Sequence, residues 1–472
     1  MASQAQRAQS ELQVIPMLAL ETLYLGVDIG KATHVAGFVS PTLLTRHQRF
    51  ESCPAFSFTN SREGFRALVD RISTYVPLTQ VYVVLEVTGH YHRALLHYLQ
   101  ELDIPVYVLH VQKRQAGLLK TDKRDALGLA NLLLNQLEKG VQVGDPMQAV
   151  RRLVPPTPAA AQLRGMVHHR YELTVESTRR KNKLTAICDE VFPEFVQVCK
   201  NPNLPTALAI RTHFPTPAAL ATASLAALQE RRGSARSLSD AKLLELQRLA
   251  AQSIGTKEAG RLRGLVVEQS QLIEELTLIQ QHLEQLETEL RQVVTTCREG
   301  QILTSIPGIG PIQAATIIAN FERAAQLKSY CGWAPMLSQS GTTLDRARLS
   351  SRGARLLKHI MYLVAWQAVR LKDCEWARIY ERLLLIKCRY DERTRRYSGR
   401  GKLIGRIAGQ IISVAYALLK KDQELLSSLF PGTTPPGPTL YDPQVHRRHR
   451  EGHYRATHSR EKVQKLIQFP LH

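Results

Sequence analysis

The chain lacks the usual marks of a secreted protein, of a cysteine-bound zinc site and of a membrane protein. Its seven cysteines are scattered, and no two have Cys-x-x-Cys spacing. The odd number and irregular spacing argue against a zinc site and a disulfide framework, and they suit a reducing cytoplasm. No basic stretch followed by a continuous apolar segment marks the N-terminus, so no signal peptide is expected. The most apolar late stretch, near residues 407–419, is too short and interrupted to span a bilayer, so no membrane partner is expected.

Positive charge is what the chain has in excess. Lysine and arginine number 62 against 41 acidic residues, a formal charge of +21. Such a surplus favours a polyanionic partner through electrostatic attraction and counterion release. A generally basic soluble protein is the alternative, but the motifs described below favour nucleic acid. The length of 472 residues suits about three domains, and the apolar fraction of 44% predicts true hydrophobic cores.

An α/β domain is expected over residues 21–150, after a flexible leader at 1–20. Apolar patterning predicts three early strands, at 23–28, 33–39 and near 49–58, and a helix that Ser61 caps. Strands at 81–86 and 106–111 then alternate with helices at 91–101 and 121–138. Three early strands followed by this alternation is the order of a ribonuclease-H-like fold, although periodicity alone indicates only an α/β domain.

Residues 151–299 are predicted to form a helical and coiled-coil region. It comprises a long Arg-rich helix at 159–191, a small helical insertion near 200–258, and a helix at 261–294. Leucine, isoleucine and valine occupy the a and d heptad positions of this last helix, with Gln269 as the polar exception. The seam could pair with the helix at 159–191 or join two protomers, and an amphipathic helix packed on its own domain is the remaining alternative.

The rest of the chain is predicted to be an all-helical domain at 300–430 and a basic tail. The tail, residues 431–472, is rich in proline, histidine and arginine and has no apolar period. We expect it to stay disordered until it binds a partner. A solvated tail without a specific role is the alternative.

Four carboxylates in the N-terminal half form a candidate divalent-metal site. Asp28 and Glu86 end predicted strands, and Asp122 and Asp125 lie three residues apart at the head of a helix, on one face. Hard oxygen ligands suit Mg²⁺ or Mn²⁺, which can activate a nucleophile and stabilise a leaving oxygen in phosphodiester chemistry. Alternatively, Asp28 could cap a turn, and Asp122 and Asp125 could simply be acids that the helix dipole favours in a first turn.

A Pro-Gly-x-Gly turn lies between two predicted helices near residue 307. Pro307, Gly308 and Gly310, followed by small residues, indicate a helix-hairpin-helix. Its glycines would let the backbone approach a DNA phosphate, and the second helix would present free N–H groups. A purely structural αα-hairpin is the alternative.

A serine-rich loop follows at residues 332–343. Ser340 directly precedes Gly341, and Arg346, Arg348 and Arg352 follow closely. A loop serine with nearby arginines could be a nucleophile with phosphate clamps. A turn serine beside a basic helix is the ordinary explanation.

Taken in this order, these motifs resemble those of the DEDD transposases of bacterial insertion sequences, the bridge-RNA-guided serine recombinases. The likeness covers roughly residues 22–195 and 260–425. Its N-terminal motifs are Gly26-Val27-Asp28-Ile29-Gly30-Lys31, Leu85-Glu86-Val87-Thr88-Gly89 and Lys120-Thr121-Asp122-Lys123-Arg124-Asp125-Ala126. Its C-terminal motifs are Ile306-Pro307-Gly308-Ile309-Gly310, Gly332-Trp333-Ala334-Pro335, Gln339-Ser340-Gly341, Ser351-Arg352-Gly353 and Tyr380-Glu381-Arg382.

The resemblance implies a RuvC-like N-terminal domain and a C-terminal transposase domain in a bacterial cytoplasmic protein. Asp28, Glu86, Asp122 and Asp125 would hold Mg²⁺, and Ser340 would attack DNA, with Ser338 as its rival. A noncoding guide RNA would pair with double-stranded donor and target DNA. The working unit would be a homo-oligomer, a dimer or tetramer, joined by the coiled coil. The insertion and the long basic tail depart from the family pattern.

Three other functions remain open on the sequence. A RuvC-like nuclease or junction resolvase would use the metal site without serine chemistry. An actin-like or sugar-kinase ATPase is suggested by the turn at residues 28–31, but a second glycine-rich phosphate loop is missing from the sequence. A nucleic-acid scaffold without catalysis is the third.

Overall fold

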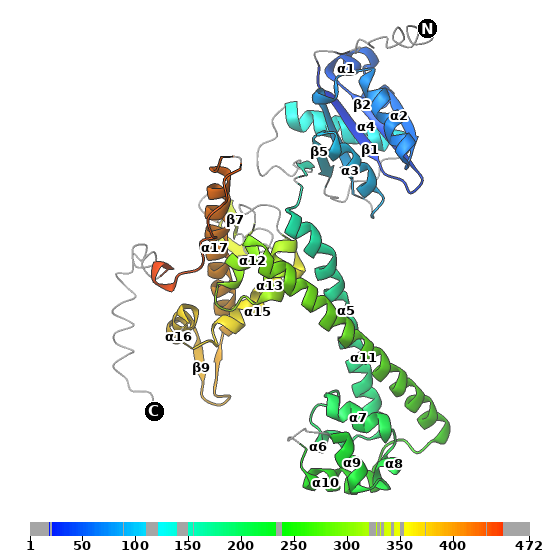
Figure 1. Cartoon of the computed structure of the whole chain (residues 1–472), viewed down its shortest axis with the longest axis vertical. Helices are drawn as coiled ribbons and strands as arrows, with labels where there is room; N and C mark the ends of the chain where they lie inside the picture. Colours follow the sequence, from blue (N-terminus) through cyan, green and yellow to red (C-terminus); the bar gives the residue numbers. More distant parts are fainter. Residues whose placement is uncertain are drawn as a thin grey trace. The chain divides into compact units, whose positions relative to one another are not determined.

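The computed structural model divides the chain into two compact units, Met1–Pro155 and Pro156–His472. Figure 1 shows the folds of both units. The residues that the structure describes are Leu18, 21–87, 89–109, 121–138, 150–153, 155–232, 238–320, Leu327, Cys331, 335–340, 344–349, 354–372, 374–430 and 432–446.

The first unit is built on a mixed sheet. Within the described residues its strand order is β3-β2-β1-β4-β5-β6. β1 runs parallel to β4, and β4 to β5, whereas β2, β3 and β6 pair antiparallel with their neighbours. This order agrees with the expected α/β fold of the ribonuclease-H type. The strands are β1 (Leu23–Asp28), β2 (Thr33–Val39), β3 (Ala55–Thr59), β4 (Val81–Glu86), β5 (Val106–Leu109) and β6 (Val150–Arg152).

Helices complete the first unit, and Ser61 caps one of them as predicted, accepting from the N–H of Gly64. The sequence did not predict α1 or the short strand β6. The third strand begins at Ala55 rather than near Arg49, because residues 50–52 form a 3-10 helix, η1. The α-helices are α1 (Pro41–His47), α2 (Arg62–Ser73), α3 (His92–Glu101) and α4 (Asp122–Glu138).

Two long helices, α5 (Pro158–Val191) and α11 (Ala259–Thr296), pack side by side in the second unit (Figure 1). They run antiparallel, because early residues of α5 pair with late residues of α11. The cross-helix ion pairs are Arg170–Glu287 at 2.6 Å, Arg180–Glu275 at 2.7 Å, Lys183–Glu268, and Glu190–Arg261 at 2.7 Å. Most of the predicted heptad residues of α11 are buried. The seam that could have joined protomers therefore packs against a helix of its own chain.

The insertion forms a small helical core on one end of this helix pair. Leu184 of α5 and Leu276 of α11 are fully buried in that core. The opposite ends of both helices, including Leu163 and Leu290, are buried in the core of the C-terminal helices. The helix pair thus links two cores. The insertion helices are α6 (Phe195–Val198), α7 (Pro205–His213), α8 (Pro217–Ala221), α9 (Leu225–Arg232) and α10 (Asp240–Ala251).

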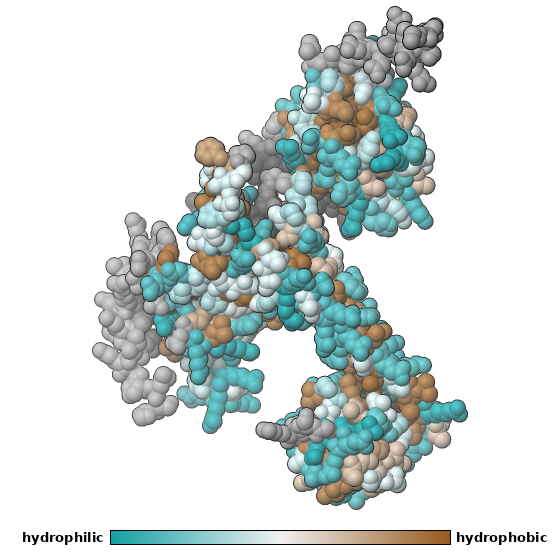
Figure 2. Space-filling model, in the orientation of Figure 1, coloured by the Kyte–Doolittle hydropathy of each residue, from teal (hydrophilic) through white to brown (hydrophobic). Residues whose placement is uncertain are grey.

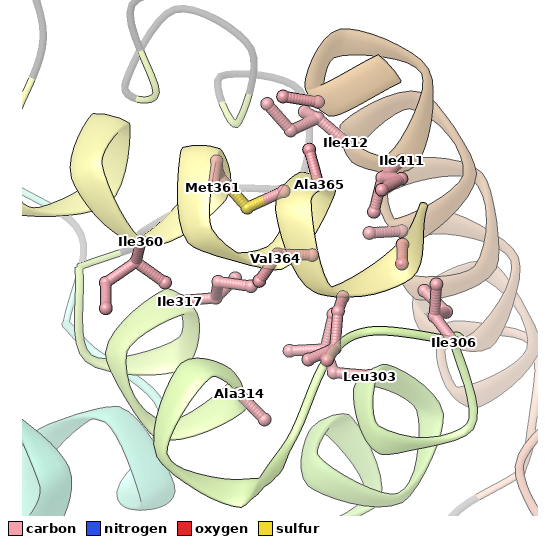
Figure 3. Packing of buried hydrophobic residues seen from close by; sticks show 14 of the residues in the cluster. Leu303, Ile306, Ala314, Ile317, Ile360, Met361, Val364, Ala365, Ile411 and Ile412 are labelled. Carbon is pink, nitrogen blue, oxygen red and sulfur yellow. The ribbon is translucent and has the colours of Figure 1, made fainter. Parts of the chain in front are cut away.

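The C-terminal helices pack around α15, with α13 and α17 on its two sides (Figure 3). Leu303, Ile317, Val364 and Ile411 are among the residues buried where these helices meet. The helices are α12 (Arg298–Thr304), α13 (Pro311–Ala319), α15 (Arg355–Ala368), α16 (Glu375–Lys387) and α17 (Arg400–Ser427).

The prediction of an all-helical C-terminal domain is wrong. Two antiparallel hairpins interrupt the helices: β7 (Pro335–Ser340) with β8 (Leu344–Leu349), and β9 (Arg389–Asp391) with β10 (Arg396–Ser398). Serine, threonine, glycine and arginine dominate these segments, so they carry little of the alternating apolar pattern by which strands are recognised. These strands form through backbone pairing within each hairpin, which the sequence pattern does not predict.

Two expectations about the end of the chain also need correction. α17 extends over 28 residues and is long and apolar enough to cross a membrane, unlike the short segment predicted. Its apolar residues, such as Ile407 and Ile411, are buried in the C-terminal core. The tail was expected to be disordered from residue 431, yet Tyr441 N–H donates to Ser305 Oγ at 2.9 Å and His446 packs on Trp376.

Candidate active site

Two of the candidate metal ligands end neighbouring parallel strands. In the register of β1 and β4, Val27 lies opposite Leu85, so Asp28 and Glu86 follow on the same edge of the sheet. Both residues are half-buried. Parallel strands end together, and this edge is where α/β folds gather functional side chains.

Helix α4 brings the other two carboxylates to this edge. It packs so closely on β1 that a Cβ atom at Gly26 would lie 2.1 Å from the carbonyl oxygen of Ala126. At the other end of the helix, the Tyr24 hydroxyl donates to Glu138 at 2.7 Å. α4 therefore runs antiparallel to β1, and its first turn lies toward the end of the strand that carries Asp28.

The first turn of α4 begins with Asp122, which is exposed, and Asp125, which is half-buried. Thr121 caps it, since the Arg124 N–H donates to Thr121 Oγ1 and the Asp125 N–H to Thr121 O at 2.9 Å. Arg124 also pairs with Glu51 of η1 at 3.3 Å. These contacts fix the start of the helix, and with it the backbone of both aspartates.

The four carboxylates suit a hard cation, but their side chains do not lie close enough together to form a complete metal site. Among the residues that the structure describes, no three His, Cys, Asp or Glu side chains are grouped so as to hold a metal ion. The acids share an edge of the sheet, with oxygen as their only donor atom. That chemistry fits Mg²⁺ or Mn²⁺ and does not fit a soft metal.

His34 is a buried residue beside this edge that no sequence motif marks. Its Nδ1 accepts from the N–H of Gly30 at 3.2 Å, which holds the turn that follows Asp28. Burial lowers the pKa of His34 from its usual value, so the ring stays neutral at neutral pH and keeps this acceptor. An isolated histidine in a strand gives no signal for such a role in the sequence.

The Pro-Gly-x-Gly turn lies between α12 and α13, as predicted, but Gly308 has a different neighbour from the one expected. Its φ of +91° is in the left-handed region. A Cβ atom there would lie 2.7 Å from Ala368 Cβ and 2.8 Å from Val364 O, both in α15. The close backbone approach that Gly308 permits is therefore to a helix of its own domain. Gly310 precedes α13, and Pro311 is the first residue of that helix.

Ser340 is the last residue of strand β7, not part of a loop. In the hairpin register, Ser340 lies opposite Leu344, Ser338 opposite Arg346, and Met336 opposite Arg348. The backbone thus sets the serine-bearing strand directly against the strand that carries two of the predicted arginines. Arg352 lies outside the described residues.

Comparison with known proteins decides the family. Residues 25–193 match a family model for the DEDD transposase of IS110, described as "Transposase", and residues 300–381 match the "Transposase IS116/IS110/IS902 family". The first match contains all four carboxylates, and the second contains the turn at 307–310 and the hairpin with Ser340. This chain belongs to the DEDD transposases of insertion sequences. It is therefore an enzyme that acts on DNA.

Relatives of this transposase have low sequence identity to it, and one of them is matched over nearly its whole length. An insertion element IS110 protein of 43.6 kDa from Streptomyces coelicolor is 24% identical over 84% of this chain and 94% of its own length. An insertion element IS116 protein of 44.8 kDa from Streptomyces clavuligerus is 24% identical over 45% of this chain and 55% of its own. The pilin gene-inverting protein of Moraxella bovis is 28% identical over 34% of this transposase and 46% of its own length.

Proposed function

We propose that this transposase cuts and rejoins DNA by metal-dependent chemistry in which a serine hydroxyl attacks the phosphodiester. The observation that carries the proposal is the packing of α4 on β1 at Gly26. This contact brings Asp122 and Asp125 toward the strand end that bears Asp28, with Glu86 on the neighbouring strand. Four acids at one edge of a strongly basic protein suit a cation bound beside a polyanionic substrate.

The four carboxylates would hold Mg²⁺ or Mn²⁺ through their oxygen atoms. The bound cation would polarise the scissile phosphate and stabilise the negative charge that develops on it. The protein's own contribution is positioning. Thr121 fixes the first turn of α4, and His34 fixes the turn after Asp28.

Ser340 is the proposed nucleophile, with Ser338 as the rival. Its Oγ would attack the phosphorus, and the bond from phosphorus to the 3′ oxygen would break. The serine proton would pass to a nearby base, because a serine hydroxyl is a weak nucleophile at neutral pH, and the departing oxygen would take a proton to become a 3′ hydroxyl. The resulting phosphoserine ester keeps the phosphodiester energy, so strands could exchange and rejoin without ATP.

The partners follow from the family resemblance and the charge of the chain. They are double-stranded donor and target DNA, a noncoding guide RNA, and further copies of the chain in a dimer or tetramer. The turn at Pro307, Gly308 and Gly310 would contact DNA backbone as a helix-hairpin-helix, and Arg346, Arg348 and Arg352 would clamp phosphates. Because Gly308 faces α15, the phosphate contacts of the turn would come from the N–H groups that begin α13.

The first experiment tests the carboxylates. Asp125→Asn is expected to reduce strand cleavage of DNA that carries the element ends by at least about 100-fold, because loss of one ligand charge weakens metal binding. Asp70→Asn, an exposed carboxylate on α2 of the same unit, is the matched control and should cleave normally. Equal activity of both variants would remove Asp125 from the reaction.

The second experiment tests the serine. After denaturation, the wild-type protein should carry a covalently attached polynucleotide, and Ser340→Ala should carry none. Ser338→Ala, two residues away on the same strand, should still form the adduct. Full cleavage by Ser340→Ala without any adduct would instead identify a hydrolytic nuclease or junction resolvase that uses the carboxylates alone.

A further inference from the structure

The hairpin β9–β10, residues 389–398, has no role in the chemistry described above. It joins α16 directly to α17 and projects from the end of α16 (Figure 1). Its surface is hydrophilic (Figure 2), and nearly all of its side chains are exposed. We call it the basic hairpin.

Positive charge is concentrated on the basic hairpin and on the adjoining ends of α16 and α17, residues 387–402. The acidic residues in this stretch are Asp391 and Glu392. The basic residues are Lys387, Arg389, Arg393, Arg395, Arg396, Arg400 and Lys402. A surplus of this size on a narrow projection gives a strong local field for a polyanion.

Two tyrosines pair across the ribbon and help to hold its two strands together. Tyr390 lies directly opposite Tyr397 in the register, and their ring centroids are 4.9 Å apart with a 57° angle between the rings. An isolated two-stranded hairpin is marginal in water, and a cross-strand aromatic pair stabilises it. The ribbon is therefore formed in advance of any partner. Tyr390 remains 47% exposed beside its paired ring.

The tip of the basic hairpin is also preorganised. The Asp391 carboxylate accepts from the N–H groups of Arg393 and Thr394, at 3.0 and 3.4 Å, and from the Thr394 hydroxyl at 2.9 Å. These bonds close the four-residue loop. They leave the side chains of Arg393 and Arg395 exposed at its end.

The base of the hairpin is anchored to the helical core. Arg400 donates to the Tyr380 hydroxyl at 3.0 Å and lies over the ring of Trp366, 5.1 Å from its centroid. Trp366 itself packs against the C-terminal core. The hairpin thus projects from a fixed base, so a ligand bound at its tip is held relative to that core.

We propose that the basic hairpin is a docking element for duplex DNA, with Arg393 and Arg395 at the phosphates that border a groove. This inference rests on the proposed function, because it takes DNA as the substrate. The B-DNA major groove admits a two-stranded β-ribbon, whereas the major groove of duplex RNA is too deep and narrow. The tyrosine rings pack against each other, so they are less suited to stacking on the unpaired bases of a single strand.

The test is binding of the full-length protein to a fluorescent duplex of about 30 base pairs, in EDTA, over a range of salt concentrations. Arg393→Gln with Arg395→Gln should weaken binding about tenfold at moderate salt. It should also reduce the slope of log Kd against log salt by about 2, since each phosphate contact contributes about 0.9. Arg393→Lys with Arg395→Lys keeps the charge and should retain most of the slope.

Glu392→Gln is the matched control in the same loop. Removing this negative charge should tighten binding, whereas the arginine changes weaken it. A variant that merely disturbed the loop would not bind more tightly. The proposal fails if the double glutamine variant keeps the wild-type slope, or if it loses affinity only for a single strand or for RNA of the same length. A wild-type protein that binds no duplex at all would overturn the proposed function as well, whereas wild-type binding with an unchanged variant overturns the hairpin alone.

Discussion

At the scale of single residues, the lack of a side chain at Gly26 helps to shape the candidate active site. Gly26 allows the backbone of α4 to lie directly on β1, with Ala126 and Ala130 as its contacts. Any larger residue at this position would push the helix outward. Asp122 and Asp125 would then move away from Asp28, although none of the three had been changed.

We expect Gly26→Ala to destabilise the protein by about 1–3 kcal/mol through overpacking and to impair DNA cleavage as well. The matched control is Gly128→Ala in α4 itself, where a Cβ would meet only a ring carbon of Phe50 at 4.0 Å. That change removes a helix-interior glycine and should stabilise by about 0.5–1 kcal/mol. Thermal unfolding followed by circular dichroism measures both. A Gly26→Ala protein as stable as the wild type would show that α4 does not depend on this close contact.

At the scale of elements, the polar exception in the heptad pattern of α11 has a specific partner. Gln269 is buried, and its Oε1 accepts two bonds from Arg211 of α7, at 3.1 and 2.7 Å. Its Nε2 donates to the Arg211 carbonyl at 3.1 Å. The Arg211 guanidinium also donates to Pro202 O and Leu184 O, and burial lowers its pKa from the ordinary arginine value. The heptad exception is therefore where the insertion docks on the helix pair.

Gln269→Leu restores a perfect apolar seam, yet we expect it to destabilise the insertion by about 1–3 kcal/mol or more. The change leaves a buried cationic group with fewer acceptors. Arg211→Met combined with Gln269→Leu should recover much of the loss, because it removes both polar partners together. Protease resistance of residues 200–258 and thermal unfolding measure the effect in a double-mutant cycle. Simple additivity of the two changes would mean that the pair does not interact.

Elements with a regular apolar period could be predicted from the sequence. The sheet strands β1, β4 and β5 and the long helices α5 and α11 all have one, and the structure places them close to the predicted bounds. The strand β6 and the hairpin β7–β8 are short and polar, so they depend on pairing with distant or neighbouring backbone rather than on a local pattern.

The candidate site was predictable only in part, for a related reason. Strand ends and helix starts mark Asp28, Glu86, Asp122 and Asp125 as candidates. Their common edge, however, depends on the direction in which α4 crosses β1. That direction follows from two tertiary contacts, Gly26 with Ala126 and Tyr24 with Glu138, which the sequence does not show. Similarly, the sequence shows a flexible turn at Gly308, but not that the neighbour it approaches is α15.

At the scale of the whole molecule, the C-terminal segment is part of the second unit's fold. Residues 432–446 lie against the helices: Arg298 donates to Pro436 O at 2.7 Å, and Tyr441 shares a 2.8 Å hydrogen bond with His446. His446 in turn lies 4.6 Å from Trp376, measured between ring centroids. Trp376 has no exposed surface. The segment therefore acts as a strap over one side of the C-terminal core.

Two truncations test this role of the segment. Ending the chain after residue 446 keeps all of these contacts and should leave the thermal transition of the protein almost unchanged. Ending it after residue 430 removes them, and we expect a loss of about 1–3 kcal/mol and a red shift in tryptophan emission as Trp376 meets water. Identical emission spectra for the two truncated proteins would show that the segment does not protect Trp376.

The ion pairs between α5 and α11 also bear on how copies of this transposase can associate. Three of them pair a basic residue of α5 with an acidic residue of α11. Two α11 helices aligned in parallel would therefore place Glu268, Glu275 and Glu287 of one copy beside the same glutamates of the other, and these like charges would repel. Such homotypic pairing is disfavoured. Domain swapping, in which α5 of one copy lies along α11 of another, would preserve all of these ion pairs and the apolar seam between the two helices. An assembly could thus form by exchanging helices while burying no new surface along their length.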